Sequence, residues 1–185
     1  QDMVKKRLLM EYTDQGVQKF TLPPFVPGVA EFQLMTGEIT PELVEFTRKF
    51  HDAFNAKQNV FLEKLSEMGS SFGRVVPVNE SVSSTQHVLA YEDARSIIKN
   101  AKTFSISHCY CRMAKDVLNE KSCKAPRDIC MSFDFAAEFL IRNEIGAEAD
   151  RDTMLRKLDL AEKHNLVHVT DNAQSGFSFM CHCCG

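Results

Sequence analysis

The sequence predicts an α+β fold that is mostly helical, with short β-hairpins and a cysteine-rich metal module. Three observations predict it. Apolar residues recur at helical spacing along several segments, most clearly from Thr40 to Gly69. Short apolar runs that are separated by turn residues predict paired strands. Seven cysteines fall into two tight groups, spaced C-x-C-x11-C-x6-C and C-x-C-C.

Length and composition limit the class of protein. The 185 residues suffice for about one domain with a hydrophobic core. No apolar run approaches the ~18 residues of a membrane helix, so we expect no membrane contact. The odd number of thiols and the lack of an apolar leader favour reduced cysteines in the cytoplasm over a disulfide framework. The net charge of −3 argues against a nucleic-acid surface, and the one basic cluster is Lys5-Lys6-Arg7.

The first 22 residues predict a helix followed by a hairpin. Residues 2–11 are amphipathic, and residues 12–22 form two strands around an Asp-Gln-Gly turn. A hairpin after a helix is also how a winged helix ends. We therefore interpret 1–22 as the remnant of a winged-helix-like region and 23–185 as a helical/β domain that carries the cysteine module. Both ends of the chain look cut from a longer protein.

Caps and breakers delimit the later elements. Thr40 and Pro41 begin a long helix whose phenylalanine stripe we assign to the core. Pro77 places its strand at a sheet edge. Asp128 and Asp150 are candidate helix caps. The predicted elements are a helix over 40–69, a strand over 74–79, a possible strand at 88–89, a helix over 91–101, a strand over 103–107, helices over 128–141 and 150–164, and a hairpin with strands at 166–170 and 176–180.

The spacing of the cysteines favours a site with several metal atoms. Both groups follow predicted strands, so each C-x-C is expected to be extended, with its thiols ~6.6 Å apart along one face. Two ligands of one zinc ion lie only ~3.8 Å apart, and structural zinc sites favour C-x2-4-C pairs, which the chain lacks. Cys130 is predicted in the first turn of a helix, where the dipole lowers a thiol pKa.

All seven thiols are candidate cofactor ligands, and the first six of them are candidate metal ligands. They are Cys109, Cys111, Cys123, Cys130, Cys181, Cys183 and Cys184. We expect Cys109, Cys123 and Cys130 to contribute more than Cys184. We also expect strands 103–107 and 176–180 to be neighbours, so that both groups face one site.

Other side chains near the cysteines have supporting roles at most. Arg112 either compensates the charge of a cluster or is solvated. His108 and His182 flank cysteines and are interpreted as neighbours of the ligands. No Ser/His/Asp constellation, phosphate loop or catalytic carboxylate pair is recognisable, so the sequence nominates no catalytic residue.

Several motifs together resemble a known family. They are Pro23 to Gln33 (PPFVPGVAEFQ), Pro77-Val78, Cys109-Tyr110-Cys111-Arg112, Cys123, Cys130, Leu166-Val167-His168 with Asn172, and Cys181-His182-Cys183-Cys184-Gly185. In this order they resemble the iron–sulfur-binding (4Fe-4S ferredoxin-type binding-domain) proteins of anaerobic bacteria and archaea. The resemblance implies an iron–sulfur cluster of the [4Fe-4S] type. It also implies a preceding winged-helix-like region and a following tail with two ferredoxin motifs, which this chain lacks.

The leading hypothesis is one-electron transfer from an iron–sulfur cluster to a partner redox enzyme, which makes the chain an electron carrier or accessory subunit rather than a catalyst. One alternative is a redox- or oxygen-sensing transcription regulator, which would contact nucleic acid only through the N-terminal region. The other is a structural zinc-binding interaction domain.

Overall fold

The structure is a computed structural model that describes residues 2–23, 28–67, 73–78, 93–173 and 176–184. The possible strand at 88–89 lies outside these residues. The strands are β1 (Met10–Asp14), β2 (Val17–Thr21), β3 (Gly73–Val75), β4 (Phe104–His108), β5 (Asp128–Phe133), β6 (Ala147–Ala149), β7 (Val167–Asp171) and β8 (Phe179–Cys183). The helices are α1 (Asp2–Lys5), α2 (Val29–Leu34), α3 (Pro41–Glu67), α4 (Ala94–Asn100), α5 (Tyr110–Val117), α6 (Asp134–Arg142) and α7 (Arg151–Lys163).

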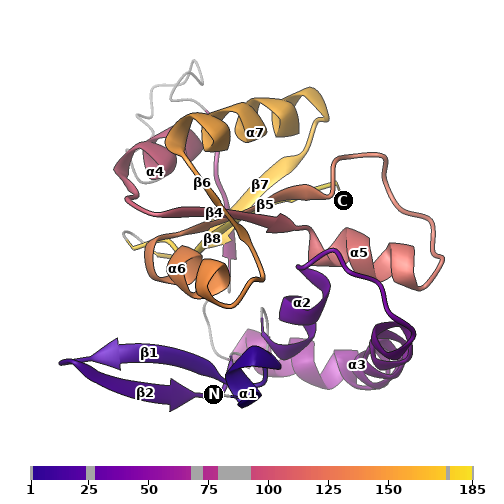
Figure 1. Ribbon diagram of the computed structural model, residues 1–185. Helices are drawn as coiled ribbons and strands as arrows, with labels where there is room; N and C mark the ends of the chain where they lie inside the picture. Colours follow the sequence, from indigo (N-terminus) through magenta and orange to yellow (C-terminus); the bar gives the residue numbers. More distant parts are fainter. Residues whose placement is uncertain (1, 24–27, 68–72, 79–92, 174–175, 185) are drawn as a thin grey trace.

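A six-stranded antiparallel sheet organises the molecule (Figure 1). Its strand order is β3-β7-β8-β5-β4-β6, and β1 and β2 form a separate two-stranded sheet. The prediction of a mostly helical fold with short hairpins is therefore wrong: helices make up 44% and strands 25%, and the sheet is the central element. Among the described residues there is also no separate cysteine-rich module, because Cys130, Cys181 and Cys183 belong to the sheet itself.

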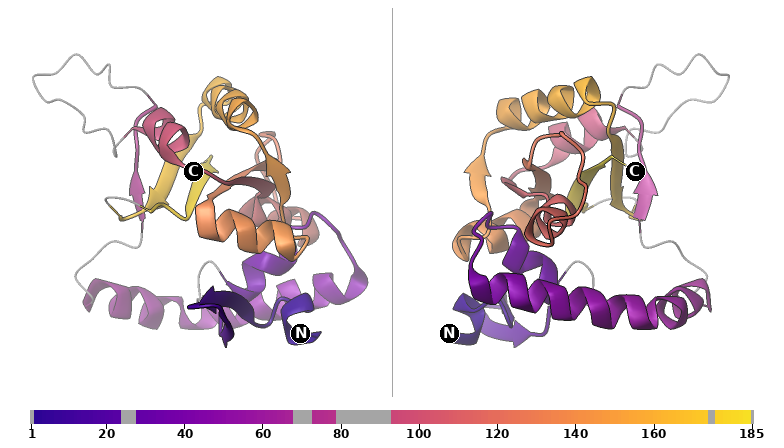
Figure 2. Two further views of the ribbon diagram at one scale, coloured as in Figure 1. Left: turned by 60° about the vertical axis from the view of Figure 1, so that its left-hand side comes forward. Right: turned by 90° about the vertical axis from the view of Figure 1, so that its right-hand side faces the viewer.

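Helices cover both faces of this sheet (Figures 1 and 2). On one face, α4 and α7 pack over the strands, and the core between them includes Ile98, Met131 and Leu158. On the other face α6 packs against β4, β5 and β6. Beyond α6 lie α2, α3 and the β1–β2 hairpin (Figure 2). No helix in the described part of the chain is both long and apolar enough to span a membrane.

Elements with strong caps and turns are confirmed. Thr40 accepts a hydrogen bond from Leu43 N (3.2 Å) at the start of α3, and Asp150 accepts one from Thr153 N (2.7 Å) at the start of α7. The first hairpin turns at Gln15 and Gly16, both at positive φ. The hairpin of β7 and β8 is also confirmed, and β3 lies at the sheet edge. Whether residues 1–22 derive from a winged helix stays a prediction.

Three predictions about helices are wrong. The helix predicted over residues 2–11 is only the short α1, because β1 already begins at Met10. Asp128 begins a strand, and the helix that we placed from Asp128 begins only at Asp134. The residues of β5 after Asp128 are all buried, so they show none of the polar alternation that distinguishes a strand from a helix. The phenylalanine stripe of α3 is not a core: Phe46 is 38% exposed, and Phe50 and Phe54 are partly exposed.

Candidate metal centre

The sheet brings both cysteine groups to one of its ends. β4 and β8 each pair antiparallel with β5, so they run in the same direction and end on the same side. Cys109 follows β4, while Cys181 and Cys183 lie at the end of β8. The prediction that these strands are direct neighbours is wrong, because β5 lies between them and adds Cys130. At ~4.8 Å per strand spacing, the two groups are about two spacings apart.

All seven cysteines line one cavity of about 230 Å³. This is the volume of several water molecules, each of which occupies about 30 Å³ in the liquid. Arg112, Lys115 and His182 also line it, and none of its described wall residues is a carboxylate. All seven thiols are free in the structure, and Cys111, Cys183 and Cys184 are exposed. The cavity therefore combines seven thiols with positively charged side chains.

The first C-x-C does not have the expected extended geometry. Cys109 is the N-cap of α5, with φ −68° and ψ 104°, and Cys111 lies in the first turn. Cys109 N donates to Arg127 O (2.6 Å), and Cys109 O accepts from Met113 N (2.9 Å). A hydrogen bond with Cys111 lowers the pKa of Cys109 to about 6 despite burial, and the same bond raises the pKa of Cys111. The helix N-terminus that we expected at Cys130 is therefore found at this pair.

The second C-x-C is extended, as expected. Cys181 and Cys183 lie on one side of β8 and His182 on the other, and Cys130 lies within β5 rather than on a helix. A hydrogen bond with Cys130 raises the pKa of Cys181, and burial adds to the effect. Burial also raises the pKa of Cys183, and negative charge on Cys109 raises it further. Each of these five thiols interacts with at least one other of the five, and we call Cys109, Cys111, Cys130, Cys181 and Cys183 the central group.

Cys123 and Cys184 form a second pair beside Arg112. Arg112 is 2% exposed, and its guanidinium donates to Cys123 Sγ (3.1 Å), Pro126 O (3.3 Å) and His182 O (2.7 Å). Burial raises the pKa of Cys123, but hydrogen bonds with Cys184 and Arg112 outweigh it and bring this pKa to about 7. Of the two interpretations of Arg112, the structure excludes a solvated side chain.

Arg127, which the sequence did not indicate, holds the Cys123 loop against α5. Its guanidinium donates to both carboxylate oxygens of Asp116 (2.7 and 2.8 Å) and to the carbonyls of Cys123 and Ala125 (2.8 Å each). The bond from Arg127 lowers the pKa of Asp116. An arginine between two cysteines matches no recognisable sequence motif, so only the tertiary structure reveals this role.

A buried histidine pair lies behind the thiols. The Nδ1 atoms of His168 and His182 are 2.7 Å apart, and both side chains are buried. Burial lowers the pKa of His182 to about 3, with help from the charges of His168 and Arg112, and burial also lowers the pKa of His168. Both rings are therefore neutral near pH 7, with one Nδ1 donating to the other. His182 Nε2 is buried and has no hydrogen-bond partner among the described residues.

The comparisons with known proteins found no relative whose site could be compared with this one. No family model, curated protein or solved structure matches the chain. Within the described residues, no group of three or more His, Cys, Asp or Glu side chains is arranged to hold a single metal ion as it stands.

Proposed function

We propose that the protein binds an iron–sulfur cluster of the [4Fe-4S] type at the end of the sheet and passes single electrons to a partner redox protein in the cytoplasm. The observation that carries this proposal is the lining of one cavity by all seven cysteines, although their two groups are about 50 residues apart in the sequence. Iron–sulfur clusters are held by cysteine thiolates, four of them for the four-iron type. The donor set therefore fits the group in both chemistry and number.

The central group supplies more than enough ligands. It contains five thiols, and its members affect one another's pKa values. The pKa of Cys123 is set instead by burial, Cys184, Arg112 and Ala125, and the one influence of the pair on a central thiol is the small effect of Cys184 on Cys183. We therefore assign the four ligands to the central group and a supporting role to the Cys123–Cys184 pair. This revises the expectation that Cys123 contributes more than Cys184.

The charges around the cavity suit an anionic cluster. A cluster with four thiolates carries net negative charge, which increases when it accepts an electron. Arg112 is fixed beside the thiols by two backbone carbonyls, so its positive charge stabilises the reduced form without having to move. When bound, the cluster supplies the one-electron chemistry. The chain positions its sulfur ligands and sets its potential through charge, burial and hydrogen bonds.

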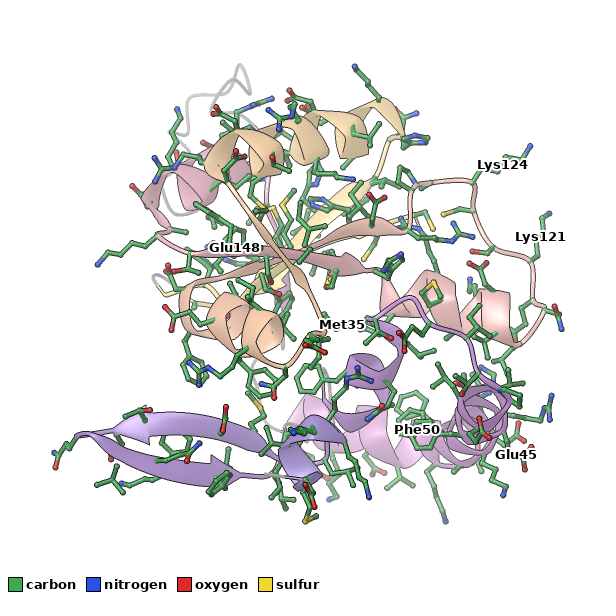
Figure 3. The ribbon with its side chains drawn as sticks, viewed as in Figure 1. Met35, Glu45, Phe50, Lys121, Lys124 and Glu148 are labelled. Carbon is green, nitrogen blue, oxygen red and sulfur yellow. The ribbon has the colours of Figure 1, made fainter. Side chains whose placement is uncertain are left out.

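A partner can approach the cavity from outside. Cys111, Cys183 and Cys184 are exposed, so these thiols of the cavity are in contact with solvent. Lys121 and Lys124 flank Cys123 in sequence and point away from the body of the protein (Figure 3). Lys115 lines the cavity itself and is exposed. Basic side chains at the cavity and on the Cys123 loop favour a redox partner with an acidic docking surface.

Metal and sulfide analysis of protein purified without oxygen tests the proposal. We expect a brown protein with about four iron and four sulfide per chain, and a paramagnetic resonance signal after reduction with dithionite. Colourless protein that contains about one zinc ion per chain would overturn the proposal in favour of the zinc-binding alternative. Apo-protein reconstituted with iron and sulfide provides the control for clusters lost during purification.

A further inference from the structure

A second and larger cavity lies on the α6 side of the sheet, next to the cysteine cavity. Its volume is about 530 Å³, within the range of about 300–1,000 Å³ that is typical of small-molecule sites. The two cavities share four wall residues: Tyr110, Cys130, Cys181 and Cys183. A molecule in the larger cavity would therefore contact the residues that line the metal centre.

The position of the cavity follows from how α6 covers the sheet. This helix packs against β4, β5 and β6, and β8 lies beyond β5. Phe135, Ala136 and Phe139 of α6 form one wall, and the sheet residues Ser132 and Phe179 form another. Phe32 of α2 stacks at a tilt on Phe139, with ring centroids 5.5 Å apart, and forms part of the far side.

The lining has the chemistry of a site for aromatic ligands. Five aromatic rings contribute to it: Phe32, Tyr110, Phe135, Phe139 and Phe179. Apart from the cysteines shared with the proposed cluster site, none of the described residues around the cavity carries a charge. The hydroxyl groups in that described lining belong to Tyr110, Ser132 and Ser178. Such a site excludes ions, because an ion would lose its hydration without gaining a counter-charge.

We propose that this cavity binds an uncharged, planar aromatic molecule with one or two hydrogen-bonding oxygens. The rings offer stacked or edge-to-face contacts at 4.5–7 Å between centroids, as is typical of aromatic pairs. The serine hydroxyls provide the few polar contacts that fix orientation in apolar pockets. This inference goes beyond electron transfer and does not require the cluster, since the cavity is built from side chains alone.

Two probes with the same ring system test it: 2-naphthol, which is uncharged at pH 7, and naphthalene-2-sulfonate. We expect 2-naphthol to bind the full chain at one site, with a dissociation constant on the order of 0.1 mM. The sulfonate should bind at least ~10-fold more weakly. Equilibrium dialysis and ligand-observed NMR measure both affinities. Iron is counted in every sample, so that iron content reports on the cluster and naphthol binding reports on this cavity.

Two residues of α6 provide matched variants. Ala136 lines the cavity, whereas Glu138 is exposed and does not. Ala136→Trp, and the smaller Ala136→Leu if the tryptophan variant fails to fold, should weaken naphthol binding ~10-fold or more by filling the space. Glu138→Trp and Glu138→Leu should bind as the wild type does. Equal affinity for both probes, or undiminished binding by a folded Ala136 variant, would overturn the proposal.

Discussion

Gly37 is a residue on which the position of the cysteine cavity depends. Its φ is +79°, and a Cβ atom there would lie 2.5 Å from Cε1 of His108, the last residue of β4. His108 N also donates to Met35 O (3.0 Å), so this short turn holds β4 where the chain passes into Cys109. Any side chain at position 37 must therefore displace the His108 ring.

We expect Gly37→Ala to destabilise the protein by about 2–3 kcal/mol, from a strained φ and a displaced ring. Gly16→Ala is the matched control, because Gly16 has φ +77° but no atom within 4 Å of the added Cβ. It should cost only about 1 kcal/mol. Urea denaturation of both variants measures the difference. Equal losses would show that the contact with His108 carries no energy.

Arg112 should set the reduction potential of the proposed cluster. Removing its charge in Arg112→Gln is expected to lower the potential by on the order of 50–100 mV, from Coulomb's law at an effective dielectric constant of about 20. Arg112→Lys keeps the charge and should stay closer to the wild-type value. Redox titration of samples with equal iron content measures the shifts.

Lys115→Gln is the control for Arg112, because Lys115 lines the same cavity but is exposed. Solvent screens its charge, so its removal should change the potential by less than half as much. If Arg112→Gln and Lys115→Gln shift the potential equally, the fixed position of the guanidinium has no special effect.

At the scale of elements, the junction between β5 and α6 explains why we predicted a helix where the structure has β5. Met131 and Phe133 share a helical spacing with the apolar residues of α6, so strand and helix read as one amphipathic segment. The break lies at Asp134, a non-glycine residue at φ +47°. Its Oδ1 accepts from Lys102 N (2.7 Å) and Thr103 N (3.1 Å), contacts that are remote in sequence and invisible in a local pattern.

Replacing Asp134 should therefore destabilise the folded protein. Asp134→Ala loses both hydrogen bonds and keeps the strained φ, which predicts a loss of about 2–4 kcal/mol. Asp134→Gly should lose about 1 kcal/mol less, because glycine adopts positive φ freely. Asp134→Asn should lose about 1 kcal/mol or less, since its amide oxygen still accepts and asparagine tolerates this conformation. Thermal unfolding of the three variants orders them, and a different order would contradict this account of the junction.

The sequence identified the elements whose ends carry local signals, but not the sheet. The caps at Thr40 and Asp150 and the turn at Gly16 act within a few residues, so α3, α7 and the first hairpin were predictable. The insertion of β5 between β4 and β8 depends on pairing between strands far apart in the chain, which no local pattern encodes. For the same reason, the thiols could be nominated as candidates, but their division into a central group and a separate pair could not.

At the scale of the whole molecule, both cysteine groups line one cavity, so we expect the proposed cluster to occupy one site rather than two half-sites. If the central group holds a single four-iron cluster, replacing a ligand with alanine should remove most of the iron. We expect at least four of the five alanine variants of the central group to lose more than about three quarters of it, since four thiolates are needed. Two independent sites would instead lose about half the iron with each substitution.

Cys183 and Cys184 provide the sharpest comparison. They are adjacent and both exposed. Cys183 interacts with Cys109 and Cys130 more than with Cys184, whereas Cys184 forms a hydrogen bond with Cys123. We expect Cys184→Ala and Cys123→Ala to retain about four iron per anaerobically purified chain. Iron and sulfide analysis, with circular dichroism to confirm folding, measures this. If Cys184→Ala loses as much iron as the ligand variants do, the boundary between the central group and the pair is wrong, and the cluster lies closer to Arg112 than we infer.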